Sequence, residues 1–287
     1  MTTTRQTLIG NIAAHAILIL GAVTMIAPFL WMISTSLKDL GEVFIFPPRW
    51  LPKYWSWGNY LRIWQAKGAA GDVFIASFGQ QFLNSFKITI LGTVGQIFSC
   101  SIAAYAFARL QFRGRNVIFV ILLMTMMLPF QLTVIPIFYT MSKLRWIDTH
   151  LPLIIPFFCG GAYGTFLIRQ FFLTIPSSFG DAAKIDGCNP FKIYYYLYLP
   201  LSMPVLATLT VFTFMWRWND LFGPLVFVHT PAKMTVTLGL TAMQGQFWTD
   251  IPLLMTGSLI SLLPTLILFI ALQRFFIQGV VLAGIKG

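Results

Sequence analysis

The sequence predicts an all-α membrane protein with six transmembrane helices. Of its 287 residues, 57% are hydrophobic and only 9% are charged, whereas soluble domains carry about a quarter charged residues. The apolar residues also gather in long stretches, and a helix needs roughly 20 of them to cross a hydrocarbon core about 30 Å thick. Helices are expected because lipid offers no partner to unpaired backbone groups.

The first apolar stretch, at about residues 12–35, follows Arg5 and imitates a secretory signal. Its apolar run is longer than a signal core and lacks an obvious small-residue cleavage site, so we expect it to be retained as the first transmembrane helix. A long connection rich in Trp and Pro follows. We therefore divide the chain into residues 1–85, with the first helix and this loop, and residues 86–287, with a core of five helices.

The other five stretches cover about residues 86–108, 117–141, 151–172, 201–223 and 253–276. The fourth of the six stretches, residues 151–172, also contains Gly160, Gly161 and Gly164. Glycine and proline kink helices or let backbones approach closely. Broken helices suit a transport path, although both residues are frequent in membrane helices generally. The prolines within the six stretches are Pro28, Pro129, Pro136, Pro156, Pro204 and Pro264.

Six spans place both termini on the same side of the membrane. Arg109, Arg113 and Arg115 cluster at the tight turn between the second and third stretches, and short basic loops mark the cytoplasmic side. Basic residues in the long first connection carry less weight, because the charge rule applies to short loops. We therefore expect cytoplasmic termini and a periplasmic first connection, whose tryptophans lie either at the membrane interface or against a partner protein.

Charge and composition exclude several kinds of site. The net charge is +11, but the basic residues form no Lys/Arg block of the kind that binds nucleic acid. The cysteines and histidines are dispersed, so we expect neither a disulfide framework nor a metal site. No phosphate-binding loop of the form G-x-x-x-x-G-K-[ST] occurs, so ATP chemistry would have to come from another polypeptide. The dispersed residues are Cys100, Cys159, Cys188, His15, His150 and His229.

The connection between the fourth and fifth stretches carries explicit local signals. Ser178, with Asp181 three residues later, has the form of a capping box that starts a helix. Gly187 supplies a left-handed residue that ends one. Asn189 and Pro190 read as the N-cap and first residue of a second helix, which Pro200 would close. The sequence thus predicts two short helices joined by a sharp bend on the cytoplasmic face.

This connection resembles the EAA motif of the permeases of ABC importers. The matching residues are Asp181-Ala182-Ala183, then Gly187, then Leu197-x-Leu199-Pro200. The spacing agrees throughout, with Asp181 in place of the usual Glu and Leu197 in place of the usual Ile. The shorter Asp181 side chain reaches less far toward an ATPase.

The resemblance extends over residues 84–287 and is to the MalG-like branch of carbohydrate importers, whose terminal tail is similar to Gly279 to Gly287. It implies a type I ABC importer permease fold in the bacterial inner membrane, with a cytoplasmic coupling-helix loop at about residues 176–200. The further matching segments are Asn84-Ser85-Phe86-Lys87, Ala103-Ala104-Tyr105-Ala106-Phe107-Ala108-Arg109, Arg113-Gly114-Arg115-Asn116, Arg169-Gln170-Phe171-Phe172 and Trp218-Asn219-Asp220.

The family implies a division of labour among subunits. A periplasmic binding protein delivers the sugar, two homologous permeases alternate access, and two ATPase subunits bind ATP and Mg²⁺ and close. This chain would then be no enzyme and hold no cofactor of its own. Its coupling loop would transmit the closure, although a merely structural amphipathic turn is the alternative. The expected coupling residues are Asp181, Ala182, Ala183, Lys184, Asp186, Gly187, Leu199 and Pro200.

Ionisable residues inside a membrane span are functional candidates, and the fifth stretch contains Arg217 and Asp220. Spaced three apart on a helix, they either pair with each other or contact substrate. Asn219 and Asp220 follow the family pattern, whereas Arg217 replaces a small or hydroxyl residue. An arginine flanked by indoles suits an acidic sugar, which it can grip through two hydrogen bonds. The candidate pathway residues are Arg217, Trp218, Asn219, Asp220 and Lys87, the last of which is equally explained as an interfacial lysine.

The loop before the sixth stretch contains Gln244, Gly245 and Gln246. Its position matches the family's periplasmic loop that probes the binding protein, and the alternative is an ordinary polar connection.

Three other functions remain open on the residues alone. A secondary transporter would show inverted repeats, and none is convincing here. A membrane-embedded enzyme would need clustered catalytic groups, which the dispersed histidines do not supply. A permease for another class of solute is also possible, because the EAA pattern marks importers and not the sugar.

Overall fold

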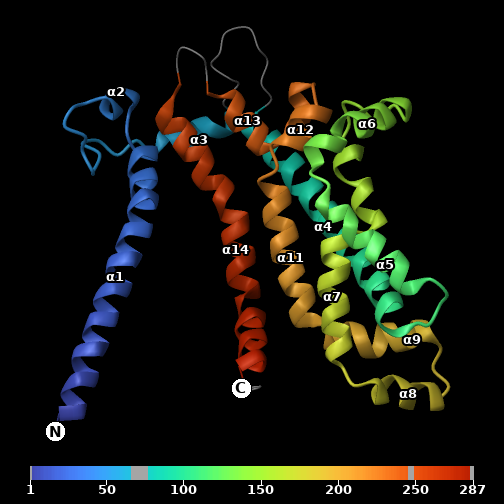
Figure 1. Ribbon diagram of the computed structural model, residues 1–287. Coiled ribbons are helices and arrows are strands. Elements are labelled where there is room, and N and C mark those ends of the chain that lie inside the picture. Colours follow the sequence, from blue (N-terminus) through green and yellow to red (C-terminus); the bar gives the residue numbers. More distant parts are fainter. Residues whose placement is uncertain (1, 66–76, 245–248, 285–287) are drawn as a thin grey trace. The chain divides into compact units, whose positions relative to one another are not determined.

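The computed structural model describes residues 2–65, 77–244 and 249–284, with side chains over 10–64, 77–244 and 249–274. The chain forms two compact units, shown in Figure 1, which we describe separately. The first unit comprises Met1–Val73 and Leu240–Leu262, and the second comprises Phe74–Gly239 and Leu263–Gly287. The expected all-α membrane fold is confirmed.

The first unit contains α1 (Thr2–Ser36), α2 (Leu40–Val43), α3 (Gly58–Gln65) and the beginning of α14 (Ile251–Gly284). Its long loop folds back on the end of α1, because the Asn59 amide donates to the carbonyls of Ser36 and Lys38 at 2.9 and 3.0 Å. Arg62 also pairs with Asp250 at 3.1 Å. The loop is therefore tied to both long helices of this unit.

The second unit is built around α4 (Phe78–Arg109), which packs against α7 (Ala162–Thr174) and α11 (Met203–Trp218). Small residues allow this approach: a Cβ on Gly164 of α7 would lie 2.8 Å from Cys100 Sγ and 3.1 Å from Leu209 Cδ2. The remaining elements are α5 (Arg115–Met124), η1 (Thr125–Met127), α6 (Phe130–Lys143), η2 (Leu151–Leu153), η3 (Ile155–Cys159), α8 (Ser177–Ile185), α9 (Pro190–Ile193), η4 (Tyr194–Tyr198), α10 (Leu199–Leu201), α12 (Phe222–Phe227), η5 (Pro231–Lys233) and α13 (Val236–Ala242).

The predicted spans are present, but two of them are not straight. Among the described residues, four segments are long and apolar enough to cross a membrane: Gly10–Ser36, Phe78–Arg109, Leu151–Thr174 and Ile251–Arg274. The third and fifth predicted stretches are instead bent pairs, Arg115–Met127 with Phe130–Lys143 at 102° and Pro190–Leu201 with Met203–Trp218 at 76°. The first bend follows Leu128 and Pro129, where the helix cannot continue its hydrogen bonding.

An acidic residue joins two loops of the second unit. Asp148 accepts hydrogen bonds from the backbone N–H groups of His229 and Thr230 at 2.9 and 2.8 Å. Its carboxylate also accepts from the Thr230 hydroxyl at 2.5 Å and from Lys233 Nζ at 3.0 Å. The loop after α6 and the loop after α12 are thereby held together at the end of the unit opposite α8 (Figure 1).

Candidate functional site

The first helix of the predicted coupling loop is α8, and its start differs from expectation. The helix begins at Ser177 with Pro176 at the N-cap position, where no side chain caps it. Ser178 therefore lies inside the first turn, and the predicted capping box is wrong. Pro176 explains the difference, because its extended backbone and fixed φ set the entry to the helix without a hydrogen-bonded cap.

The bend at Gly187 forms as predicted. Gly187 has φ +80°, and its N–H donates to the Lys184 carbonyl at 3.0 Å while Cys188 N–H donates to the Ala183 carbonyl at 2.9 Å. This pair of bonds is the Schellman arrangement that ends helices with a left-handed glycine. A Cβ on Gly187 would meet nothing within 4 Å, so the requirement for glycine lies in the backbone alone.

The second helix also starts as predicted, but it ends later. Asn189 Oδ1 accepts from Lys192 N–H at 2.8 Å, and Pro190 is the first helical residue. Helical structure then continues through the π turn η4 and through α10 to Leu201, so the expectation that Pro200 closes the helix is wrong. The wider π turn allows the helix to pass Pro200, which has no N–H to donate. The chain bends only after α10, between Leu201 and Met203.

Aromatic packing and one arginine anchor the coupling loop to the spans. A Cβ on buried Gly180 of α8 would lie 3.1 Å from the Tyr198 hydroxyl. The Tyr198 ring packs on Tyr105 of α4 at 5.3 Å and on Phe172 of α7 at 5.5 Å between centroids. Arg109 donates to the carbonyls of Phe172 and Ile175 and lies 4.9 Å from the Tyr198 ring centre. The loop is therefore packed against α4 and α7 through Tyr198 and Arg109.

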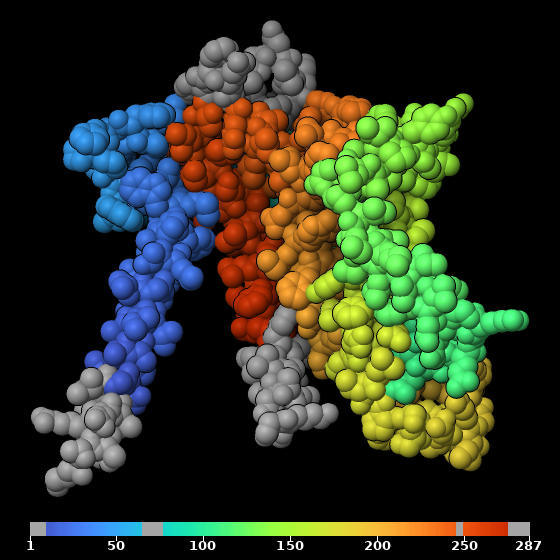
Figure 2. Space-filling view, viewed as in Figure 1, coloured from blue at the N-terminus to red at the C-terminus, as the bar shows by residue number. Residues whose placement is uncertain are grey.

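The outward face of the loop is partly apolar. Ile185 is 87% exposed, Phe191 is 68% exposed and Phe179 is 53% exposed. The loop that carries these residues lies at one end of the second unit and is coloured yellow to gold in Figure 2. Sequence reasoning did not name them. The helical period could have found them, because Gly180 and Ala183, three apart, face inward and leave the neighbouring positions outside.

The predicted coupling residues divide between the two faces of this loop. Ala183 and Leu199 are partly buried and pack on the aromatic core. Asp181 and Lys184 pair with each other at 3.0 Å, and both side chains are more than half exposed, so the pair adds little stability. The remaining members are exposed: Ala182, Asp186, Gly187 and Pro200.

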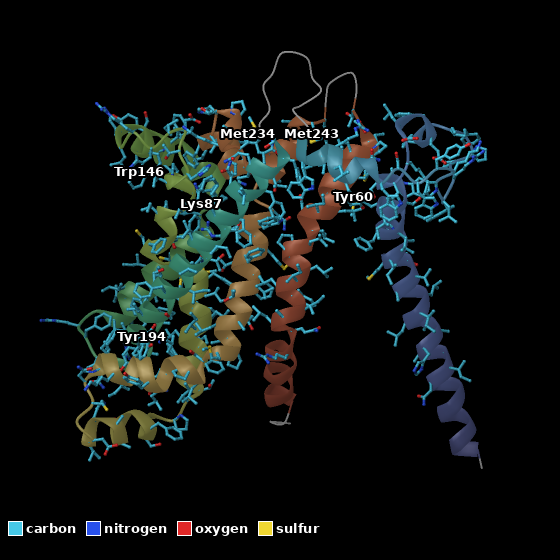
Figure 3. All side chains as sticks on the ribbon, turned by 180° about the vertical axis from the view of Figure 1, so that it is seen from behind. Tyr60, Lys87, Trp146, Tyr194, Met234 and Met243 are labelled. Atoms are coloured by element: carbon cyan, nitrogen blue, oxygen red, sulfur yellow. The ribbon has the colours of Figure 1, made fainter. Side chains whose placement is uncertain are left out.

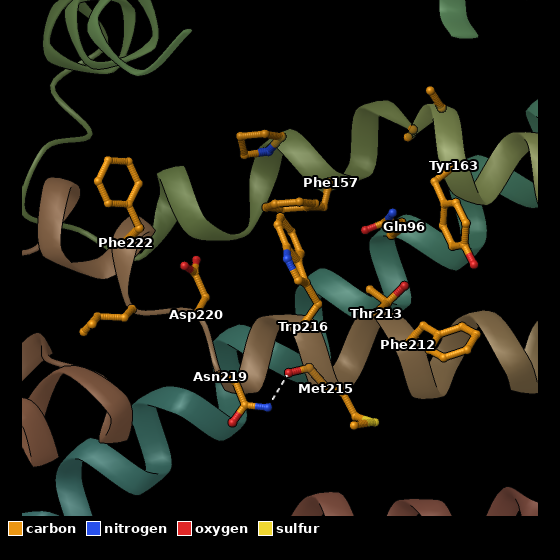
Figure 4. Close-up of a pocket in the computed structure, with 15 residues that line it drawn as sticks. Gln96, Phe157, Tyr163, Phe212, Thr213, Met215, Trp216, Asn219, Asp220 and Phe222 are labelled. Carbon is orange, nitrogen blue, oxygen red and sulfur yellow. Dashed lines mark hydrogen bonds between the residues drawn. The ribbon is translucent and has the colours of Figure 1, made fainter. Parts of the chain in front are cut away.

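A large cavity lies beside α11 in the second unit. Its volume is about 1040 Å³, and its lining combines aromatic rings with a few polar groups (Figure 4). Such a lining, with rings for sugar faces and amide or carboxylate groups for hydroxyls, suits a polyhydroxylated solute. The polar members are Gln96, Thr213, Asn219 and Asp220, and the aromatic members are Phe157, Tyr163, Phe212, Trp216 and Phe222.

The structure brings two of the five predicted pathway residues to this cavity, Asn219 and Asp220. The Asn219 amide donates to the Met215 carbonyl at 2.8 Å, the dashed line of Figure 4. Trp218 is buried instead and stacks on Phe214 at 5.7 Å.

Lys87 and Arg217, the other two predicted pathway residues, do not line the large cavity, whereas Trp216 does. Lys87 is exposed on α4, toward the end of the unit away from Tyr194 (Figure 3). Arg217 is buried next to a second, smaller cavity, and among the described side chains it forms no ion pair with Asp220 within 4 Å. Trp216, which sequence reasoning passed over, is the exposed indole of this helix.

Two other predictions concern the outer loop and metals. Gln244 is exposed, while Gly245 and Gln246 lie outside the described residues. Over the part of the chain that the structure describes, no group of three His, Cys, Asp or Glu side chains is placed to hold a metal ion.

Comparison with known proteins assigns the chain to a family. Residues 97–281 match the model of the binding-protein-dependent transport system inner membrane component. The chain is 33% identical over 273 residues to the sn-glycerol-3-phosphate transport system permease protein UgpE of Pectobacterium atrosepticum, covering 94% of this chain and 96% of the relative. It is 32% identical over 254 residues to the arabinooligosaccharides transport system permease protein AraQ of Halalkalibacterium halodurans, covering 88% and 86% of the two chains.

A solved structure agrees with this assignment. A chain of a bacterial ABC transporter that imports the acidic polysaccharide alginate superposes with a TM-score of 0.80 at 25% identity, over 95% of this chain and 98% of that one. The recognised resemblance is thereby confirmed. This protein belongs to the family of inner membrane components of binding-protein-dependent transport systems.

Proposed function

We propose that this chain is one of two homologous permease subunits of an ATP-driven carbohydrate importer. The observation that carries this proposal is the coupling loop, whose apolar outer face is free while its inner face is fixed to α4 and α7. An element built in this way receives a push from a partner and moves the spans with it. To the predicted coupling residues we add Phe179, Ile185 and Phe191. The predicted set is Asp181, Ala182, Ala183, Lys184, Asp186, Gly187, Leu199 and Pro200.

The partners follow from this role. Two ATPase subunits bind ATP and Mg²⁺ and press on the coupling loops, and this chain itself holds no cofactor. Both termini and the coupling loop lie in the cytoplasm. A periplasmic binding protein delivers the solute on the other side, where the loop with Gln244, Gly245 and Gln246 meets it. The relatives support a carbohydrate cargo, because AraQ serves arabinooligosaccharides and the solved neighbour imports alginate.

The pathway runs along α11. Asn219 and Asp220 already line the large cavity, and Trp216 and Phe157 offer rings on which a sugar can stack. Arg217 stands directly behind this wall and favours an acidic saccharide. Trp218 supports the helix from within, and Lys87 adds positive charge nearer the outer end of α4.

The test is reconstitution of the membrane complex with this chain in liposomes. We expect ATP hydrolysis to rise when the binding protein and its saccharide are added. This stimulation is expected to disappear in Gly187→Pro, because proline cannot adopt φ +80°, while the ATPase subunits still co-purify. Transport that proceeds without ATP, with no ATPase subunit in the complex, would overturn the proposal in favour of a secondary transporter.

A further inference from the structure

Arg217 presents a buried guanidinium whose two faces are both covered. The residue lies near the end of α11 and is 7% exposed. Its Cζ lies 3.0 Å from the ring centre of Phe157 in η3. On the other side lies α4, where a Cβ on Gly92 would stand 2.5 Å from Arg217 Nη1. Only the edges of the guanidinium plane remain for hydrogen bonding.

One of these edges has no partner. Nη1 donates to the Leu153 carbonyl at 3.0 Å, but Nε and Nη2 are buried without a hydrogen bond among the described residues. Nε–H and Nη2–H point the same way along one edge of the plane, which is the edge that grips a carboxylate or phosphate through two parallel bonds. Buried charged donors without a protein partner are rare and costly, so this edge of Arg217 is suited to bind an anionic group.

Arg217 lines a cavity of about 300 Å³ that is separate from the large one. This volume is at the lower end of ligand sites, which run from about 300 to 1,000 Å³, so it has room for one charged sugar residue and not for an oligosaccharide. Phe157, Trp216 and Asp220 line both cavities. The small cavity, called the side chamber below, therefore shares a wall with the large cavity of the proposed pathway.

Asp220 is the other charged residue in the lining of this chamber. Its Oδ1 accepts from Gly223 N–H at 3.1 Å, which fixes the carboxylate at the start of α12. A carboxylate here repels a bare anion, but it accepts hydrogen bonds from hydroxyl groups. Arg217 and Asp220 together match a solute that carries an oxyanion and a hydroxyl side by side.

We infer that the chamber at Arg217 is an oxyanion subsite for an anionic, polyhydroxylated solute. The Nε–Nη2 edge holds the carboxylate of a uronate residue or the phosphate of a polyol phosphate, and Asp220 receives a neighbouring hydroxyl. This inference rests on the proposed importer function and assigns its preference for an acidic solute to one defined subsite. The shared chemistry is the oxyanion, and the experiment separates its two sources.

The experiment compares uptake of three solutes by the complete complex in liposomes: a uronate tetrasaccharide, glycerol 3-phosphate and a neutral tetrasaccharide. Arg217→Gln removes the charge, Arg217→Lys keeps the charge without the fork, and Gly92→Ala keeps the arginine but pushes its guanidinium aside. Arg145→Gln removes the same charge from an exposed position and is the control. All variants use the same binding protein, so its own preference cancels when each is compared with the wild type.

We expect the ratio of anionic to neutral uptake to fall about tenfold in Arg217→Gln, which corresponds to roughly 1.4 kcal/mol. Gly92→Ala is expected to lower it similarly, Arg217→Lys to lower it less, and Arg145→Gln to leave it unchanged. The anionic solute whose uptake falls identifies the source of the oxyanion. If the complex does not assemble with Arg217→Gln, the uptake ratio of the Gly92→Ala complex tests the inference.

The inference is overturned if Gly92→Ala and every assembled Arg217 variant keep the wild-type ratio, or if the wild-type complex takes up neither anionic solute. If either result is found while uptake of the neutral sugar still depends on ATP, the proposed importer function remains supported. Uptake that needs no ATP refutes that function instead, so the two failures are distinguishable.

Discussion

Asp148 shows at the scale of one residue how hydrogen bonding sets a pKa. Partial burial by itself raises the pKa of Asp148, but hydrogen bonds from the Thr230 side chain, the Thr230 and His229 backbones and Lys233 outweigh it. The pKa therefore lies well below its usual range. A carboxyl group with a depressed folded-state pKa stabilises the fold above its unfolded pKa of about 3.9, and this stability is lost as the pH falls through the folded value.

Asp148→Asn is expected to lower the stability of the second unit by about 2 kcal/mol at neutral pH, because charged hydrogen bonds are lost. The difference from the wild type should stay constant between about pH 5 and pH 8 and shrink below about pH 4, where the Asp148 carboxyl group of the unfolded wild-type chain begins to protonate. Thermal unfolding of the purified protein in detergent, followed at each pH, measures this. A difference that changes around pH 6 to 7 would point to a histidine instead.

Gly187 allows a cleaner test of backbone conformation than most glycines. A left-handed residue other than glycine costs about 1–2 kcal/mol, and asparagine tolerates this region better than β-branched residues do. Because a Cβ here meets nothing within 4 Å, packing does not blur the comparison. Gly187→Asn is expected to retain most of the ATP hydrolysis that the loaded binding protein stimulates, and Gly187→Val to lose most of it. Equal activity in both variants would show that the bend is not needed for coupling.

At the scale of elements, the coupling loop joins a rigid inner face to an open apolar outer face. Ile185 is the most exposed apolar side chain of α8. Burying such a side chain in a partner contributes about 1.5–3 kcal/mol, or roughly tenfold or more in affinity. Ile185→Asp is therefore expected to reduce the ATPase subunits that co-purify, measured as their ratio to this chain.

The matched control is Leu144→Asp, which places the same charge at an exposed leucine just after α6. We expect the Leu144→Asp complex to keep its ATPase subunits. Equal retention in both variants would mean that Ile185 takes no part in docking.

The elements also show what could be predicted from the sequence. Gly187 and Asn189 were read correctly, because each acts through its own backbone or its immediate neighbours. Ser178 was not, since Pro176 had already set the start of α8. Both signals are local: the capping box of Ser178 and Asp181, and Pro176 before it. They predict different first residues for the same helix, and the sequence alone does not show which one applies.

The cavity was harder to predict for a different reason. Consecutive residues of one helix point in different directions, so the choice between Trp216 and Trp218 depends on how α11 is rotated. That rotation is set by contacts of Trp218 with Phe214 and Phe82, the latter from a distant part of the chain. The six stretches could be found from composition, and Pro129 marked the place of one bend, but the bend angles of 102° and 76° could not be read from the sequence.

At the scale of the whole molecule, two of the six predicted spans are bent helix pairs over the described residues. The third predicted span begins with Arg115–Met127, after which the chain turns by 102° into α6. Thirteen helical residues rise only about 20 Å, against a hydrocarbon core of about 30 Å. Because α6 runs nearly perpendicular to this segment, it adds no further depth.

This short crossing leads to a prediction about the surrounding lipid. Bilayers adapt to a short hydrophobic segment by thinning, at a free-energy cost that grows with the mismatch. Uptake is therefore expected to be faster in liposomes whose acyl chains have about 16 carbons than in those with about 22 carbons. Rates that do not vary with chain length would show that another subunit covers the end of the third span.

Thinning next to one flank of a protein is a deformation of the membrane itself, and it extends beyond the protein's edge. Two such deformed borders share their elastic cost when they meet. The bend after α5 thus gives the protein an asymmetric lipid border, which favours neighbours with equally short segments on that side and thicker bilayer on the other.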